Sequence, residues 1–233
     1  LVFAGIIAGM IALSFMISWK KPANRSFYAK EGVVGVSLSW LVISLFGALP
    51  FWISGAIPSF IDCIFETVSG FTTTGASILK DVEVMEKGLL FWRSFTHWIG
   101  GMGFLVFMMS LLPMAGADPF HLMRAESPGP TKEKLVPKVR QTAKILYSIY
   151  FGLTVLEVAL LLLGGMPLFD SLVNSFGTAG TGGFSIKNAS IGYYDSTYIE
   201  VVITVFMALF GINFSAYFLL LIGKLRRFLQ HEE

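Results

Sequence analysis

The stretch Phe65-Glu66-Thr67-Val68-Ser69-Gly70-Phe71-Thr72-Thr73-Thr74-Gly75-Ala76 decides the fold of this chain. Its first residues complete an apolar segment, Phe60–Phe71, of ~12 residues, whereas a helix that crosses a membrane needs about 20. The segment then runs into Thr and Gly, which are poor residues for a helix interior. We therefore predict a short helix that enters the membrane, stops and returns as extended chain, surrounded there by protein or a water-filled cavity.

A second stretch repeats this pattern further along the chain. Residues Ala179-Gly180-Thr181-Gly182-Gly183-Phe184-Ser185 follow another short apolar segment, Phe169–Ala179. At an offset of 108 residues, identical amino acids recur in one gap-free register, and most of them fall in the Thr/Gly stretch. The pairs are Asp62/Asp170, Thr73/Thr181, Gly75/Gly183, Ser77/Ser185, Ile78/Ile186, Thr96/Thr204 and Gly103/Gly211. The register predicts an internal repeat.

The composition is that of a membrane protein. Of 233 residues, 55% are hydrophobic and only 14% are charged, and the mean hydropathy is +0.71; soluble domains carry about 25% charged residues. This excludes a disordered chain and makes an ordinary soluble domain a poor interpretation. The net charge of +2 gives no indication of nucleic-acid binding, and the single cysteine, Cys63, excludes an intrachain disulfide.

Five apolar runs are long enough to cross the membrane as helices. They predict an all-α integral membrane protein built from tandem span–pore helix–span repeats with re-entrant loops, as in K⁺ channels. The runs are Leu1–Trp19, Val33–Ile57, Leu89–Leu112, Ile145–Leu163 and Tyr198–Ile222.

The basic residues predict the orientation of these spans. Thirteen of the 17 Lys and Arg residues fall in three connections on the same predicted side, which is therefore cytoplasmic. Both Thr/Gly loops then enter from outside. The predicted organisation is a leading helix and cytoplasmic loop (1–31), a first repeat (32–112), a cytoplasmic linker (113–144), a second repeat (145–224) and a cytoplasmic tail (225–233). Because the chain starts at Leu1 within an apolar run, we expect it to be a piece of a longer protein.

The two loops have the chemistry of a cation pore. A dehydrated cation needs oxygen ligands, and backbone carbonyls from loops that meet on one axis supply them. Glycine reaches the unusual backbone angles that such loops require, and Thr adds a neutral hydroxyl. Without a carboxylate, these loops suit K⁺ better than a divalent ion. The alternative interpretation is a tight turn between packed helices.

These motifs resemble a known family. Phe65–Ala76 is similar to the first pore loop of the Trk/Ktr/HKT potassium transporters of the TrkH type, Trp92–Gly103 to the helix that follows it, and Thr178–Ser185 to the second pore loop. Members carry four such repeats around one pore, so this chain resembles an N-terminal half with two of them. The resemblance implies K⁺ coordination by carbonyls around Thr73, Thr74, Gly75, Thr181, Gly182 and Gly183. Plant members with Ser at the position of Gly75 transport Na⁺, so Gly75 favours K⁺.

Two residues of the short helices are candidates for filter support. We expect Glu66 to lie behind the first loop and brace it by hydrogen bonds, and Asn174 to be its uncharged counterpart. The alternative for Asp62 and Glu66 is a favourable charge near a helix N-terminus together with a buried acceptor. Glu157, inside a span, is interpreted either as functional or as reaching an interfacial partner.

The predicted function is K⁺ uptake through a channel-like pore in the bacterial cytoplasmic (inner) membrane, by a multi-pass protein that is not an enzyme and needs no cofactor. Its expected partners are membrane lipid, the missing C-terminal repeats, a second copy in a homodimer and a cytosolic nucleotide-binding regulatory subunit. Three alternatives remain: a complete two-repeat subunit that dimerises, a secondary transporter with broken helices, and an intramembrane hydrolase that uses His97 with Ser69 or Ser94.

Overall fold

The computed structural model describes residues 29–103 and 139–212, together with the isolated residues 5, 9 and 217. Every regular element in these ranges is a helix. They are α2 (Ala29–Ile53), α3 (Phe60–Phe71), α4 (Lys87–Met102), α7 (Val139–Leu163), α8 (Leu168–Ala179), the 3-10 helix η1 (Ser190–Tyr194) and α9 (Thr197–Gly211). The predicted leading span, most of the linker and the tail lie outside the described residues.

The element order recurs in the two halves. A 25-residue helix (α2 or α7) is followed by a 12-residue helix (α3 or α8), an irregular loop and a further helix (α4 or α9). The bounds of the short helices agree closely with the predicted segments Phe60–Phe71 and Phe169–Ala179. Ser59 caps the first of them by accepting a hydrogen bond from the Asp62 N–H, at 3.4 Å.

The long helices differ from their predicted bounds at their N-termini. α2 begins at Ala29 and α7 at Val139, so both extend into segments that we expected to be cytoplasmic loop. Both helices therefore begin a few residues before the apolar runs that start at Val33 and Ile145. The reason is physical: hydrophobicity marks only the part of a helix inside the hydrocarbon, whereas intrahelical hydrogen bonds continue into water without it.

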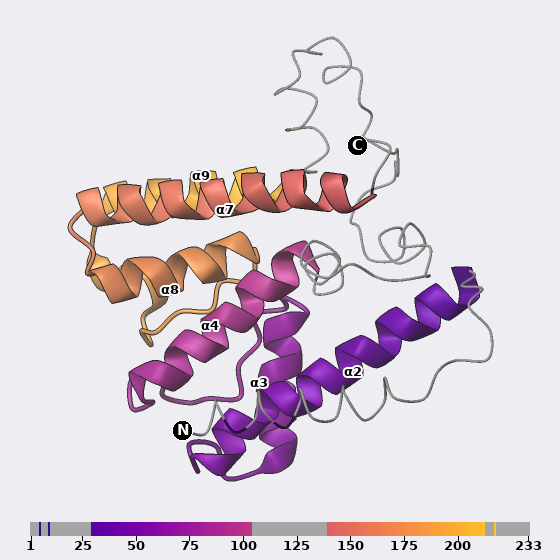
Figure 1. Ribbon diagram of the computed structural model, residues 1–233. Coiled ribbons are helices and arrows are strands. Elements are labelled where there is room, and N and C mark those ends of the chain that lie inside the picture. The colour runs from indigo at the N-terminus through magenta and orange to yellow at the C-terminus, as the bar shows by residue number, and fades with distance from the viewer. Residues whose placement is uncertain (1–4, 6–8, 10–28, 104–138, 213–216, 218–233) are drawn as a thin grey trace.

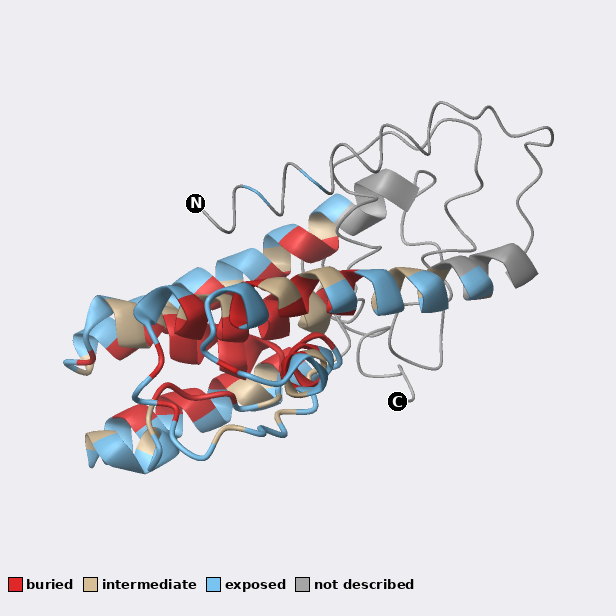
Figure 2. Ribbon diagram, turned by 90° about the horizontal axis from the view of Figure 1, so that it is seen from below, coloured by how far each residue is buried: buried red, intermediate tan, exposed pale blue. Residues whose placement is uncertain are grey.

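Helix α4 lies in the middle of the structure (Figure 1). It packs against α3 of its own half and against α8 of the other half, while α7 and α9 lie side by side and cover α8. Buried positions gather in the interior of this helical body, and exposed ones follow its outer faces (Figure 2). The two short helices and their loops are thus held between longer helices.

The outer faces of the long helices are apolar. Leu38 and Leu41 on α2, Leu156 on α7 and Val201 on α9 all expose more than half of their surface. By length and composition, two helical segments among the described residues can cross a membrane, Val36–Ile53 and Lys144–Leu163, and the apolar helix α9 is shorter. Exposed apolar surface of this extent is typical of contact with lipid or with other protein.

Candidate functional site

Two loops follow the short helices, and we call residues 72–77 loop 1 and residues 180–185 loop 2. Their first residues make the same backbone hydrogen bonds. In loop 1, the N–H groups of Thr72, Thr73 and Thr74 donate to Val68, Gly70 and Ser69 at 2.8–3.0 Å. In loop 2, the N–H groups at 180, 181 and 182 donate to the carbonyls at 176, 178 and 177. Each donor and acceptor recurs at the offset of 108, so three carbonyls in the last turn of each short helix accept hydrogen bonds from its loop.

The backbone angles of the two loops also recur. Thr73 and Thr181 have φ values of 54° and 55°, and Gly75 and Gly183 have 75° and 77°. Threonine in this left-handed region is uncommon and costs of order 1–3 kcal/mol, so it persists only where the surroundings enforce it. Gly75 and Gly183 occupy the same region without a Cβ penalty. The two loops therefore share one strained conformation, and such strain gathers at functional sites.

The two loops touch each other and α4. A Cβ atom at Gly75 would collide with the carbonyl oxygen of Gly182, and one at Gly182 would approach that of Thr73. On α4, a Cβ atom at Gly100 would collide with the carbonyl oxygen of Phe71, while Gly101 lies beside loop 2. The glycines thus let three backbones meet where side chains would separate them. Of the residues predicted to bind the ion, the structure brings Thr73, Gly75 and Gly182 together.

Glu66 lies behind loop 1. Its buried carboxylate accepts hydrogen bonds from the Ser77 Oγ at 2.9 Å and from the Ile78 N–H at 2.9 Å. Arg93 Nε donates to the same carboxylate at 2.6 Å. Ser69 adds a further tie on this side of the loop, because its Oγ donates to the carbonyl oxygen of Ala76 at 2.6 Å.

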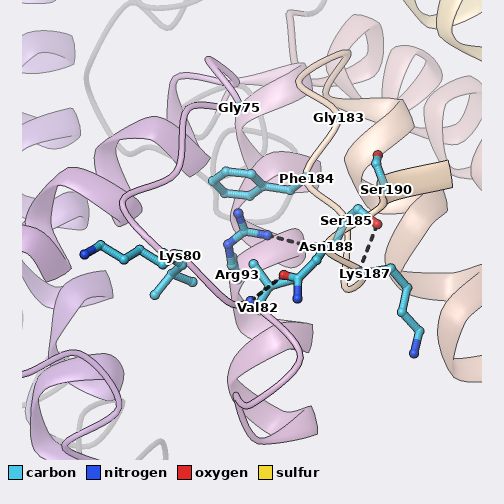
Figure 3. Close-up of a pocket in the computed structure, with 11 residues that line it drawn as sticks. Gly75, Lys80, Val82, Arg93, Gly183, Phe184, Ser185, Lys187, Asn188 and Ser190 are labelled. Atoms are coloured by element: carbon cyan, nitrogen blue, oxygen red, sulfur yellow. Dashed lines mark hydrogen bonds between the residues drawn. The ribbon is translucent and has the colours of Figure 1, made fainter. Parts of the chain in front are cut away.

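Arg93 joins the two halves. Besides its ion pair with Glu66, its Nη1 donates to the carbonyl oxygen of Ser185 at 3.0 Å, and its guanidinium lies 3.5 Å from the ring centre of Phe184 (Figure 3). Sequence reasoning missed this role, because Arg93 was counted only as a basic residue of the outer side. Its place inside an apolar run, with the acids Asp62 and Glu66 in the preceding short helix, was the available signal.

Asn174 has different partners from Glu66. Its Nδ2 donates to the hydroxyl of Tyr194 at 3.2 Å and contacts Met166 Sδ, whereas the Tyr194 hydroxyl donates to Asp170 at 2.8 Å. These partners lie in η1, in α8 and in the turn before α8. Loop 2 receives no hydrogen bond from the Asn174 side chain within the described residues, although we predicted support there. The shorter, neutral amide is held by η1 instead.

A turn from each half lies beside the site, and the two turns are joined by hydrogen bonds. Asn188 accepts from the Val82 N–H at 3.0 Å and donates to Asp81 at 2.8 Å, while Lys187 pairs with Glu83 at 3.5 Å. The hydrogen bond from Asn188 holds the pKa of Asp81 below its usual value. These turns and both loops line an open cavity of ≈250 Å³ (Figure 3). Its lining includes Gly75, Lys80, Arg93, Gly183 and Phe184.

Two other residues bear on the alternatives that the sequence left open. Glu157 is fully buried within α7, so its carboxylate does not reach an interface. His97 stacks on Phe184 with 3.9 Å between ring centres. Ser94 Oγ has no hydrogen-bond partner among the described residues, and Ser69 Oγ is committed to Ala76, so no Ser–His pair forms there. The hydrolase alternative has no support in this geometry.

Comparisons with known proteins agree with this architecture. The sequence matches the family described as TrkH, cation transport protein, over residues 2–231. It is 38% identical to the Trk system potassium uptake protein TrkH of Halomonas elongata and 40% identical to that of Escherichia coli, covering 92% of this chain in both cases. The crystal structure of the potassium transporter TrkH from Vibrio parahaemolyticus superposes with a TM-score of 0.75 and 32% identity, over 93% of this chain and 44% of that one.

The helices and the comparisons together define an all-α membrane protein of the transporter class. The chain belongs to the TrkH family of cation transport proteins. The matched relatives are transporters, which agrees with the prediction that the chain is not an enzyme. The chain spans 44% and 45% of the length of the relatives from H. elongata and E. coli.

Proposed function

We propose that this chain forms two of the segments that surround a K⁺-selective pore, and that the whole protein takes up K⁺ across the bacterial cytoplasmic membrane. Loops 1 and 2 are its re-entrant filter segments. The observation that carries the proposal is the strained backbone common to both loops, with positive φ at Thr73 and Gly75 and at Thr181 and Gly183. The relatives from H. elongata and E. coli are named potassium uptake proteins, which supports the choice of ion.

The backbone conformation suits carbonyl coordination. Residues with positive φ alternate with residues of ordinary φ in each loop, and this alternation turns successive peptide planes so that their oxygens can face one axis. The proposed ligands are carbonyl oxygens around Thr73, Thr74 and Gly75, and around Thr181, Gly182 and Gly183. Uncharged oxygen ligands replace the hydration shell of K⁺ without holding the ion too tightly to leave.

The short helices add a favourable field. α3 and α8 both end where their loop begins, so the partially negative C-terminal ends of both helices lie beside the proposed ion path. Glu66 braces loop 1, and Asn174 acts more remotely through η1. The complete pore needs further segments from the rest of the protein. A second copy of the protein and a cytosolic nucleotide-binding regulatory subunit are its proposed partners.

The test is cation uptake by the full-length protein in cells that lack their own K⁺ transport. The variant is Gly75→Ser, and the control is Gly165→Ser. Gly165 also has a positive φ, 84°, with open space at its Cβ, but it precedes α8 and lies outside both loops. We expect the parent and the control to take up K⁺ selectively and Gly75→Ser to lose rate or admit Na⁺.

Equal, K⁺-selective uptake by the parent and Gly75→Ser would reduce loop 1 to a structural turn. A transporter with broken helices that binds its substrate between the repeats would then be the better interpretation.

A further inference from the structure

We propose that Arg93 is a positioning residue that sets the spacing between loops 1 and 2 and thereby the ion selectivity of the pore. This inference rests on the proposed function. Arg93 lies on α4, in the first half of the chain. It nevertheless donates a hydrogen bond to the second half, to the carbonyl oxygen of Ser185 in loop 2.

The contacts form one continuous chain between the loops. Ser77 of loop 1 donates to Glu66, Glu66 accepts from Arg93, and Arg93 donates to Ser185 of loop 2. Ser77 and Ser185 are equivalent positions at the offset of 108. A single ion pair therefore holds the same point of both loops, each two residues beyond the left-handed glycine.

The chain is well suited to fix a distance. Glu66 and Arg93 are 1% and 3% exposed, so little of either side chain is open to water that could compete for its hydrogen bonds. A guanidinium is planar and donates in a fixed fork, which lets one side chain satisfy a carboxylate and a carbonyl in set directions. Phe184 of loop 2 covers the face of the guanidinium at 3.5 Å, and a cation above an aromatic ring is attracted to it.

The sequence provides this device once. The position equivalent to Arg93 in the second half is Val201, and that equivalent to Glu66 is Asn174. Val201 exposes 54% of its surface on α9 and cannot take part in such a bridge. Loop 2 therefore depends on the first half for this support, and a change at Arg93 acts on a loop that lies 92 residues away in the sequence.

The decisive variant is Arg93→Lys in the full-length protein. Lysine keeps the positive charge that Glu66 needs, but a single ammonium on a shorter side chain cannot reproduce the fork. We expect K⁺ over Na⁺ selectivity in uptake to fall about tenfold, which corresponds to ~1.4 kcal/mol. The maximal K⁺ rate changes less than the selectivity, because the filter residues themselves remain.

The control is Lys80→Gln. Lys80 is a basic residue that lines the same cavity. Removal of its charge alters the attraction of K⁺ and of Na⁺ to this cavity equally. The two uptake rates therefore change together, and their ratio stays constant. Selectivity of Arg93→Lys within twofold of the parent, or an equal loss of selectivity in Lys80→Gln, would overturn the proposal.

A second readout separates this inference from the proposed function. Amide hydrogen exchange of the purified protein reports the loops directly, and we expect faster exchange at residues 183–187 in Arg93→Lys with residues 76–79 unchanged. Unchanged exchange in loop 2 contradicts the bridge even if uptake is K⁺-selective. If the parent protein shows no K⁺ selectivity, the proposed function is wrong. The exchange data still decide in that case whether Arg93 holds loop 2.

Where Arg93→Lys yields too little folded protein, the double variant Glu66→Gln/Arg93→Gln replaces it. The double variant leaves no unpaired buried charge, which is the costly state of a broken ion pair. We expect the same loss of selectivity and the same faster exchange at residues 183–187. A double variant with parental selectivity and parental exchange overturns the proposal.

Discussion

Loops 1 and 2 have the same backbone but different support. Loop 1 rests on the Glu66 carboxylate, which receives two hydrogen bonds from the chain just beyond the strained residues and an ion pair from Arg93. In loop 2, the carbonyl oxygen of Ser185 accepts a hydrogen bond from Arg93, whereas the Asn174 side chain donates to the hydroxyl of Tyr194 and not to the loop. The conformation is thus common to both halves, whereas the forces that hold it are not.

This difference shows which features depend on local sequence and which on context. The hydrogen bonds at the start of each loop use backbone groups within one short helix and its loop, so they recur wherever the Thr/Gly pattern recurs. The side-chain supports reach across elements and need no matching residue in the other half. A repeat in sequence therefore predicts equivalent backbones better than equivalent side-chain networks.

The largest expected effect comes from a matched pair of truncations. Glu66→Ala leaves the buried guanidinium of Arg93 without its partner, and breaking a buried pair in this way costs about 3–5 kcal/mol. Asn174→Ala removes only neutral contacts and costs about 1 kcal/mol. Thermal unfolding in detergent measures both. Equal losses would show that the two halves are supported alike, against the comparison above.

The next effect concerns the two left-handed glycines. Gly183→Ala introduces a Cβ into open space, so its cost is the backbone term alone, about 1–2 kcal/mol. Gly75→Ala has the same backbone cost, and its Cβ would also collide with the carbonyl oxygen of Gly182, so this variant loses more stability. We expect K⁺ uptake to be abolished in Gly75→Ala and only reduced in Gly183→Ala. The reverse order would contradict the close approach of the loops.

A smaller effect tests the support that is particular to the second half. Tyr194→Phe removes the hydroxyl that donates to Asp170 and accepts from Asn174. We expect a loss of about 1 kcal/mol, below the roughly 1.5–3 kcal/mol typical of hydrogen bonds to charged groups, because Tyr194 is only partly buried. The melting temperature of the variant, measured against Tyr193→Phe as a control, checks this. An unchanged melting temperature would show that η1 contributes nothing to Asn174.

The smallest effect is a pH dependence of the melting temperature that comes from the turns carrying Asp81 and Asn188. Asn188 lowers the pKa of Asp81 in the folded protein, so this group contributes stability at pH values above its unfolded pKa, near 4. The contribution is lost as the pH falls through the lower, folded value. Asn188→Ala should therefore lower the melting temperature at pH 6. The difference should shrink as the pH falls through the folded pKa of Asp81, down to the part that comes from the lost hydrogen bond with the Val82 N–H. A constant difference across this range would contradict the link between Asp81 and Asn188.

The sequence predicted the two short helices well because their signals are local. Apolar segments that are too short to span, followed by Thr and Gly, specified α3 and α8 almost to the residue. Helices α2 and α7 begin before their apolar runs because hydropathy does not mark the polar end of a helix. Glu66 accepts hydrogen bonds from Ser77 and Ile78 because its position on the short helix fixes the face that it occupies.

The sequence by itself determined the class of the protein, the two Thr/Gly loops and their register, because composition, segment length and glycine placement act within a few residues of the chain. Only the tertiary structure decided that Arg93 of one half holds Ser185 of the other, that Asn174 turns to Tyr194 and that Glu157 is enclosed. The Arg93 contact depends on how α4 packs between α3 and α8, and the enclosure of Glu157 on how α7 packs against α8 and α9. That packing sums many weak interactions between distant segments, and no local pattern encodes it.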